Sequence, residues 1–389
     1  MPNHTSIDTL SDTVCTVLAR LTSTDKGDWF LTFRARHAME AVFHALKEEK
    51  GQGEIITQPF TCATALNPIL SAGHVPAYID SSYDTLSLDT TTLAAHTASR
   101  GLIMQHSFGI ESDMHRAREF ADKHGLLLLE DSAHQIGLMA RDDARVPLAD
   151  VSVHSFGVEK LLPTKFGGAV WVNPRMTDRS LRHRIEETLS NMPVLDNRTD
   201  SKAHRYKWCN ALLNRTPRQL EPSLRRLLVS TGVFEPAIMP DELLGKNHHR
   251  PARPSRFMLE TMLDGLQNYD TTITTRRRAA RVYRQHLPAS LIPSGLAKDC
   301  APARFPIIAP DSRASEQLFS DLRRTGYYSG KWYRPVIFPG TPRPELYHYT
   351  PTHFPVAEDI SGRIVNLPTN ITAEKAKEIA RVIVTSTHK

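Results

Sequence analysis

Residues 113–131, "DMHRAREFADKHGLLLLED", decide the fold class of this chain. The first part of the stretch has the apolar spacing of an amphipathic helix. Residues 126–131 then form an apolar run that closes with two acids. An apolar strand directly after a helix is typical of a parallel sheet that helices cover on both faces.

Helix-like and strand-like segments alternate in the same way from about residue 33 to residue 174. We therefore predict an α/β protein with a mostly parallel central sheet. Ligands of such sheets gather beyond the carboxyl ends of the strands, so the chemistry should be sought there. The other helix-like segments are 36–49 and 63–73, and the other strand-like segments are 53–59, 74–80 and 101–109.

The length of 389 residues predicts two domains, because it exceeds what one ordinary hydrophobic core supports. We expect a large domain over residues 1–266 and a smaller C-terminal α+β domain over residues 267–389. Residues 256–287 have a helical pattern that is long enough to link the two. A basic, proline-punctuated segment, about residues 176–254, predicts helices and loops within or beside the large domain.

Composition excludes several classes of protein. With 40% hydrophobic and 23% charged residues the chain is typical of soluble globular proteins, and it contains no apolar run of about 18 residues that could span a membrane. Four scattered cysteines predict neither a disulfide framework nor a metal site. The net charge of +6 comes without a nucleic-acid module, so anionic small molecules are the better partners. The first residues do not resemble a secretory signal, and we expect a cytoplasmic protein.

Two strand ends carry the residues that suggest chemistry. Asp131 closes one buried strand, and Ser155 and Lys160 follow a later one. Asp131 and Lys160 are 29 residues apart, which is roughly the length of one strand-helix-strand unit, so both can reach the same edge of the sheet. A cofactor could lie between them.

Several segments resemble the DegT/DnrJ/EryC1/StrS family of pyridoxal-phosphate-dependent aminotransferases, which act mainly on keto groups of nucleotide-linked sugars. The resemblance is close over about residues 30–175 and looser over 255–385. It implies the fold-type-I architecture of pyridoxal-phosphate-dependent transferases and a homodimer. The segments that carry it are "PFTCATALNPILSAGHVPAYID" (59–80), "EDSAHQIG" (130–137), "SFGVEKLLPTKFGG" (155–168) and "FPVAEDISGRIVNLPTNITAEKAKEIARVI" (354–383).

The resemblance assigns roles around pyridoxal 5'-phosphate. Lys160 matches the lysine whose amine binds the cofactor aldehyde covalently and later moves a proton, a task for a nucleophile that is also a base. Asp131 matches the carboxylate that keeps the pyridine nitrogen protonated. Ser155 matches a phosphate-binding hydroxyl. Ala35 and Arg36 stand where relatives hold the phosphate at a helix N-terminus with a small residue and threonine, and Arg36 would use charge-assisted hydrogen bonds instead.

Other positions are expected to contact the ring of the cofactor or to line the route by which substrate enters the site. His134 stands where relatives have glutamine or histidine bonding the phenolic oxygen of the cofactor. Cys62 replaces an aromatic ring that stacks on the pyridine, and a polarisable thiol would pack there with weaker contact. Lys165 and Phe166 replace smaller or acidic residues, which would alter substrate entry.

Candidate substrate contacts are Arg256, Tyr333 and Arg334. The last two lie where relatives place residues near the substrate, and Arg256 is among the basic residues that would attract a diphosphate. Relatives also lend an asparagine to the neighbouring subunit's phosphate. Residues 250–259 contain no match for it, and Ser255 and Arg256 are the candidates to replace it.

Each assignment has a plainer structural alternative. A lysine in a loop is ordinarily a solvated charge, and an aspartate after a strand commonly caps the next helix. Single histidines and cysteines in a core are more often structural than catalytic. The resemblance implies transfer of an amino group from an amino acid, glutamate first among them, to a keto-sugar nucleotide.

Two other functions remain open. One is a pyridoxal-phosphate-dependent sugar dehydratase or lyase, although such relatives usually have histidine where Lys160 stands. The other is a catalytically degenerate member that serves as a binding scaffold. The sequence leaves open which sugar, ring carbon and nucleotide are used, and whether the acceptor is a sugar or another ketone.

Overall fold

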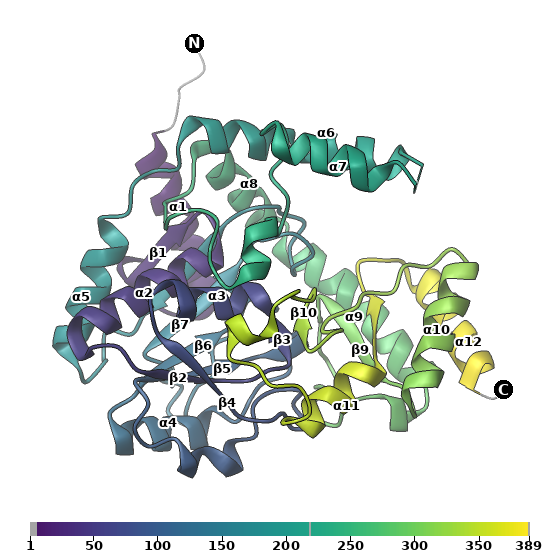
Figure 1. Ribbon diagram of the computed structural model, residues 1–389, viewed down its shortest axis with the longest axis horizontal. Coiled ribbons are helices and arrows are strands. Elements are labelled where there is room, and N and C mark those ends of the chain that lie inside the picture. Colours follow the sequence, from purple (N-terminus) through teal and green to yellow (C-terminus); the bar gives the residue numbers. More distant parts are fainter. Residues whose placement is uncertain (1–5, 218, 388–389) are drawn as a thin grey trace.

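Seven strands form the central sheet in the order β1-β8-β7-β6-β5-β2-β4, in a computed structural model that describes residues 6–217 and 219–387 (Figure 1). The five strands from β7 to β4 run parallel, and β8 pairs antiparallel with both β7 and β1. The predicted mostly parallel sheet is therefore confirmed. The strands are β1 (Trp29–Thr32), β2 (Glu54–Thr57), β4 (Val75–Tyr78), β5 (Gly101–Gln105), β6 (Leu127–Asp131), β7 (Val151–Ser155) and β8 (Gly168–Val172).

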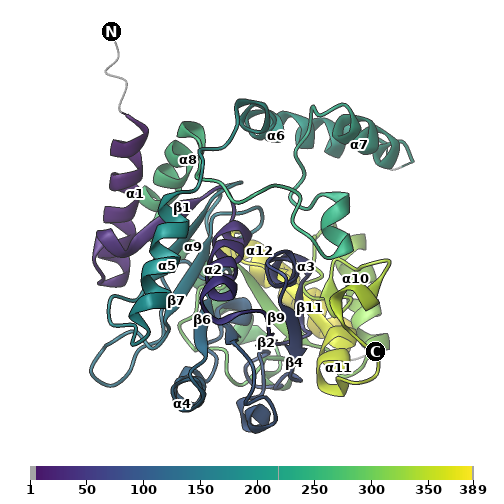
Figure 2. The same ribbon diagram turned by 60° about the vertical axis from the view of Figure 1, so that its left-hand side comes forward.

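Helices cover both faces of this sheet, as Figure 2 shows from a second side. Alternate leucines of β6 explain why that strand is apolar throughout. Leu127 and Leu129 pack in one cluster with α2 and α5, whereas Leu128 packs on the opposite face with α4. The covering helices are α1 (Ile7–Thr22), α2 (Ala35–Lys50), α3 (Ala63–Ser71), α4 (Met114–His124), α5 (Arg179–Ser190) and α8 (Arg256–Gln267).

Capping fixes the helix within the stretch 113–131. The carboxylate of Asp113 accepts a hydrogen bond from the backbone N–H of Arg116 at 3.2 Å, which caps the start of α4. Gly125 ends the helix in the left-handed conformation, with φ of 64°. The chain then enters β6, whose last residue is Asp131.

A second, smaller sheet lies in the C-terminal part of the chain, to the right in Figure 1. Strands β9 and β11 pair antiparallel, and α9, α10 and α12 contribute to the same hydrophobic cluster. A short parallel pair, β3 with β10, ties residues 337–338 to residues 61–62 beside the central sheet. The elements are β3 (Thr61–Cys62), β9 (Arg304–Ile308), β10 (Ile337–Phe338), β11 (Ile364–Pro368), α9 (Tyr269–His286), α10 (Ser312–Arg324), α11 (Pro355–Arg363) and α12 (Ala373–Thr387).

The single helix predicted over residues 256–287 is wrong, because two helices, α8 and α9, meet at Asn268. The Asn268 side chain donates a hydrogen bond of 2.9 Å to the carbonyl of Asp264, and such local bonds favour helix ends. The division of the chain into domains of residues 1–266 and 267–389 stays a prediction.

The basic segment consists of helices and loops. Helices α6 (Asn197–Arg215) and α7 (Glu221–Ser230) extend from the body as an arm in both views (Figures 1 and 2). A 3-10 helix, η4 (Pro240–Leu244), brings the chain back toward α3. Over the described residues, none of the helices has the length and apolarity needed to cross a bilayer. The remaining 3-10 helices are η1 (Lys26–Asp28), η2 (Thr90–Ala95), η3 (Ser107–Gly109), η5 (Ala289–Leu291) and η6 (Pro344–Tyr347).

Candidate active site

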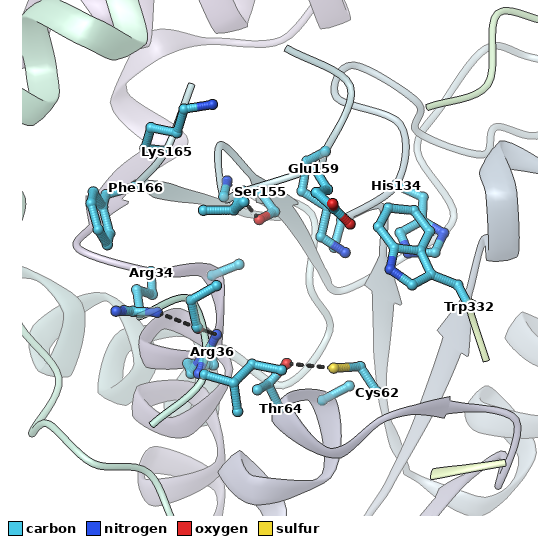
Figure 3. Close-up of a pocket in the computed structure, with 18 of the residues that line it drawn as sticks. Arg34, Arg36, Cys62, Thr64, His134, Ser155, Glu159, Lys165, Phe166 and Trp332 are labelled. Atoms are coloured by element: carbon cyan, nitrogen blue, oxygen red, sulfur yellow. Dashed lines mark hydrogen bonds between the residues drawn. The ribbon is translucent and has the colours of Figure 1, made fainter. Parts of the chain in front are cut away.

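A cavity of about 370 Å³ lies beyond the carboxyl ends of β6 and β7 and beside the first residues of α2 (Figure 3). Segments that are far apart in the sequence form its walls: the central sheet, the arm and residues 332–338. Eight of the predicted site residues line it together, namely Ala35, Arg36, Cys62, Asp131, His134, Ser155, Lys160 and Tyr333.

Lys160 and Asp131 both face this cavity. Burial lowers the pKa of the Lys160 amine, and nearby Cys62 and Asp131 oppose that shift. The Lys160 Nζ atom lies 5.0 Å from the ring centroid of Trp332. Asp131 is 5% exposed, and burial raises its pKa, while the Ala133 N–H and the Lys160 charge act in the opposite direction.

The Asp131 carboxylate keeps hydrogen-bonding capacity for a ligand. Its Oδ1 atom accepts a bond of 2.9 Å from the backbone N–H of Ala133. Within residues 6–217 and 219–387 no further hydrogen bond to this carboxylate occurs. A buried acid in that situation favours a cationic or protonated partner in the cavity.

The first turn of α2 and Ser155 line the same cavity. Arg34 precedes the helix without a side-chain cap, so the Arg34 side chain does not occupy the N–H groups of the first turn. Strand β8 passes so close that a Cβ atom on Gly168 would lie 2.4 Å from the Ala35 nitrogen. The Ser155 hydroxyl accepts a bond of 3.2 Å from the N–H of Gly157 and lies on the cavity wall.

Arg36 is already paired within the chain. Its guanidinium bonds to the Glu242 carboxylate and donates a second bond of 3.0 Å to the carbonyl of Ala237. Glu242 therefore neutralises the charge of Arg36, which we expected from the sequence to bind a phosphate. The role of Arg36 in binding phosphate stays a prediction, since the group also lines the cavity.

Both ring nitrogens of His134 are engaged. Nδ1 accepts a bond of 2.9 Å from the backbone N–H of Phe108, and Nε2 lies 2.8 Å from the Tyr333 hydroxyl. The ring stacks on Trp332 with centroids 4.6 Å apart. Figure 3 shows Trp332 and His134 on one side of the cavity and Phe166 on the other. Burial, with the Lys160 charge as a second cause, lowers the pKa of His134 well below its usual value, so the ring is neutral.

Cys62 precedes α3 and lines the cavity, where its Sγ atom accepts a bond of 3.0 Å from the Thr64 hydroxyl. Its stacking on a cofactor ring stays a prediction. Arg256 and Arg334 lie away from the cavity. Arg256 donates to Glu260 along α8 at 2.8 Å, and Arg334 donates to the Ser315 hydroxyl at 2.7 Å.

Sequence reasoning missed the contribution of the basic segment. Tyr206, Asn210 and Arg225 of the arm, with Ala237 and Ile238, complete the cavity wall. No local pattern marks them, because long-range pairing places their segment there. Ser255, a candidate for the missing asparagine, instead caps α8 and donates a hydrogen bond to Asp200. Among the residues placed by the structure, no cluster of three or more metal-ligating side chains is present.

Comparison with known proteins places this site in context. Residues 32–207 match the DegT/DnrJ/EryC1/StrS aminotransferase family, which confirms the resemblance over that part of the chain. The spore coat polysaccharide biosynthesis protein SpsC of Bacillus subtilis is 33% identical over 145 residues, which is 34% of this chain and 37% of SpsC. GDP-perosamine synthase of Vibrio cholerae is 27% identical over 179 residues, which is 44% of this chain and 47% of the synthase. The chain thus matches less than half the length of either relative.

Solved structures extend the likeness to the whole fold. A DegT DnrJ EryC1 StrS aminotransferase from Brucella abortus has a TM-score of 0.69 and 18% identity, covering 98% of this chain and 91% of that one. Identity this low shows the fold alone. The structural likeness confirms the predicted fold-type-I architecture of pyridoxal-phosphate-dependent transferases.

Proposed function

Since residues 32–207 match the DegT/DnrJ/EryC1/StrS aminotransferase family, we propose that the protein is a pyridoxal-phosphate-dependent aminotransferase. We propose further that it moves an amino group from an amino acid, glutamate first among them, to a keto group of a nucleotide-linked sugar. The observation that carries the proposal is that the Lys160 amine and the Asp131 carboxylate open on one cavity beside a helix N-terminus.

The residues present fit pyridoxal phosphate. Asp131 has spare acceptor capacity for a protonated ring nitrogen, and the Lys160 amine, whose pKa burial lowers, suits a nucleophile. The N–H groups at the start of α2 and the Ser155 hydroxyl suit a phosphate. When bound, the cofactor supplies an aldehyde that accepts the amino group and a ring that takes up the electrons released at the reacting carbon.

This chain's residues would then do the following work. Asp131 holds a proton on the ring nitrogen, and the helix N-terminus together with Ser155 fixes the phosphate end. Lys160, once its nitrogen is free, would move a proton from the carbon of the amino donor to the aldehyde carbon of the cofactor, and in the acceptor half-reaction from that cofactor carbon to the carbon of the acceptor. Tyr206, Asn210 and Arg225 of the arm line the same cavity and would limit the entry of water there.

The acceptor class rests on relatives and on charge. One relative is a GDP-perosamine synthase and another is a spore coat polysaccharide biosynthesis protein. Lys165, on the cavity wall, makes no ion pair with any carboxylate in the described part of the chain, although the Glu159 charge acts on its pKa; a cation placed there favours an anionic substrate group. The proposal includes a homodimer and a cytoplasmic location.

An absorption scan of the purified protein after incubation with pyridoxal phosphate tests the function. We expect a visible band that disappears with glutamate and returns when a nucleotide-linked keto sugar is added. A band that no amino donor changes would point to a dehydratase or lyase instead. Absence of any band would point to a binding scaffold, and both results would overturn the proposal.

A further inference from the structure

The contact between His134 and Tyr333 determines which of the two can serve a ligand. The backbone N–H of Phe108 donates to Nδ1 of His134, so that nitrogen carries no proton. The ring is buried and neutral, and a neutral imidazole then carries its proton on Nε2. Nε2 therefore donates to the Tyr333 oxygen across 2.8 Å.

This direction leaves the hydroxyl hydrogen of Tyr333 unused. Tyr333 is 3% exposed, and its oxygen makes no other hydrogen bond among residues 6–217 and 219–387. Burial raises the pKa of the phenol well above its usual value, with Cys62 and Asp131 adding to the shift, so the proton stays on the oxygen. A buried O–H group without an acceptor is costly unless a ligand supplies one.

Packing holds the Tyr333 ring in place. Phe60 meets it edge to face with centroids 5.2 Å apart, and His134 stacks beside it at 5.7 Å. The pairing of β10 with β3 anchors the chain four residues further on, at Ile337. Tyr333 also lines the cavity that Lys160 and Asp131 share, so the fixed hydroxyl belongs to the site.

We infer that Tyr333 donates a hydrogen bond to an oxygen atom of a ligand bound in this cavity, and that His134 acts only as its positioning residue. The inference rests on the proposed function and names two sources for the oxygen. One is the phenolic oxygen of pyridoxal phosphate, and the other is the keto oxygen of the amino acceptor. From the sequence we expected His134 itself to bond the phenolic oxygen of the cofactor. In this proposal the hydrogen bond to the ligand comes from Tyr333 instead.

The test compares the wild type with Tyr333→Phe, each as the full chain loaded with pyridoxal phosphate. If the oxygen belongs to the cofactor, the pH midpoint of the visible band rises by roughly one unit without substrate, because a donor to a negative oxygen is lost. If it belongs to the acceptor, the band is unchanged and the acceptor half-reaction slows roughly 100-fold, while the donor half-reaction keeps its rate.

His134→Asn separates positioning from direct contact. We expect it to reproduce the effect of Tyr333→Phe, and the double variant to add nothing, because one change misplaces and the other removes the same donor, the Tyr333 hydroxyl. Tyr283→Phe is the matched control, since Tyr283 belongs to the C-terminal cluster, does not line the cavity, and donates a partly buried bond of 2.8 Å to the Pro368 carbonyl. Tyr283→Phe should change neither the band nor the half-reactions.

Two results would overturn the inference. One is a Tyr333→Phe protein whose band and both half-reactions match the wild type. The other is a shift in His134→Asn that Tyr333→Phe lacks, which would assign the contact to His134. Failure of the proposed function looks different, because the wild type itself would then show no band that responds to an amino donor.

Discussion

The carboxylate of Glu235 accepts a hydrogen bond of 2.8 Å from the guanidinium of Arg34, which lies 201 residues earlier in the chain. His249 reaches the same carboxylate at 2.7 Å, and Lys202 lies 3.9 Å from it. Burial opposes ionisation of Glu235, but the His249 hydrogen bond and the Arg34 charge outweigh it and lower its pKa. This buried pair fastens the basic segment onto the residue that precedes α2.

Glu235→Gln should therefore destabilise the protein strongly. The change removes the negative partner of buried Arg34, and loss of one partner of a buried pair costs roughly 3 kcal/mol or more. Urea denaturation at pH 7 gives the free energy of unfolding. Glu221→Gln, which breaks a more exposed pair with Arg225 in α7, is the control and should cost less than about 1 kcal/mol. Equal losses in the two variants would refute this account of the segment.

The central sheet could be predicted from the sequence because the apolar patterns and helix caps that indicate its strands and helices are local. Residues 126–129 are four consecutive leucines, and the structure buries them in the hydrophobic clusters on the two faces of the sheet. Asp131 and Lys160 could be expected at one edge because parallel strands end there. Helix α4 follows from its own cap at Asp113.

Features that depend on long-range pairs escaped prediction. Nothing near Arg34 in the sequence indicates Glu235, and nothing near His134 indicates that Tyr333 will hold its ring. The arm was recognised only as helices and loops, although Tyr206 reaches the cavity wall. The apolar pattern predicted one continuous helix, but the helix ends at Asn268. There the Asn268 side chain bonds to a carbonyl of the preceding turn, which the apolar pattern does not reveal.

Gly168→Ala should displace the start of α2 from the sheet. A Cβ atom there would lie 2.4 Å from the Ala35 nitrogen and 2.5 Å from the Thr32 hydroxyl oxygen. Relieving this overlap requires the backbone to move, which costs free energy. We expect a loss of roughly 1 to 3 kcal/mol in the free energy of unfolding, together with weaker binding of pyridoxal phosphate. Gly362→Ala in α11 is the control, because its new Cβ would meet only Ser312 at 3.8 Å. A Gly168→Ala protein as stable as this control would contradict the steric argument.

Lys160→Ala should abolish the visible band of the bound cofactor and lower turnover by roughly a thousandfold or more, if the proposed function holds. The reason is that the amine at this cavity wall is both the nucleophile and the proton carrier. Absorption spectra and amino-transfer assays measure the two effects. Lys26→Ala removes an exposed lysine that pairs with Asp12, and it should retain the wild-type band and rate. A Lys160→Ala protein with the wild-type rate would refute the assignment of Lys160 as nucleophile and proton carrier.

Acid should destabilise the fold through His154, which lies buried in β7. Burial lowers its pKa to about 4, with His106 adding to the shift and Glu130 opposing it, whereas an unfolded histidine titrates near pH 6.5. Between these values the unfolded chain binds more protons than the folded one, so the free energy of unfolding falls as the pH falls from 6.5 to 4 and gains nothing above 6.5. At pH 5 the loss from this residue is about 2 kcal/mol. Urea denaturation at pH 7 and pH 5 should show a smaller decrease for His154→Asn than for the wild type or for His115→Asn, whose ring is exposed on α4. An identical decrease in all three proteins would mean that His154 takes up its proton without resistance from the fold.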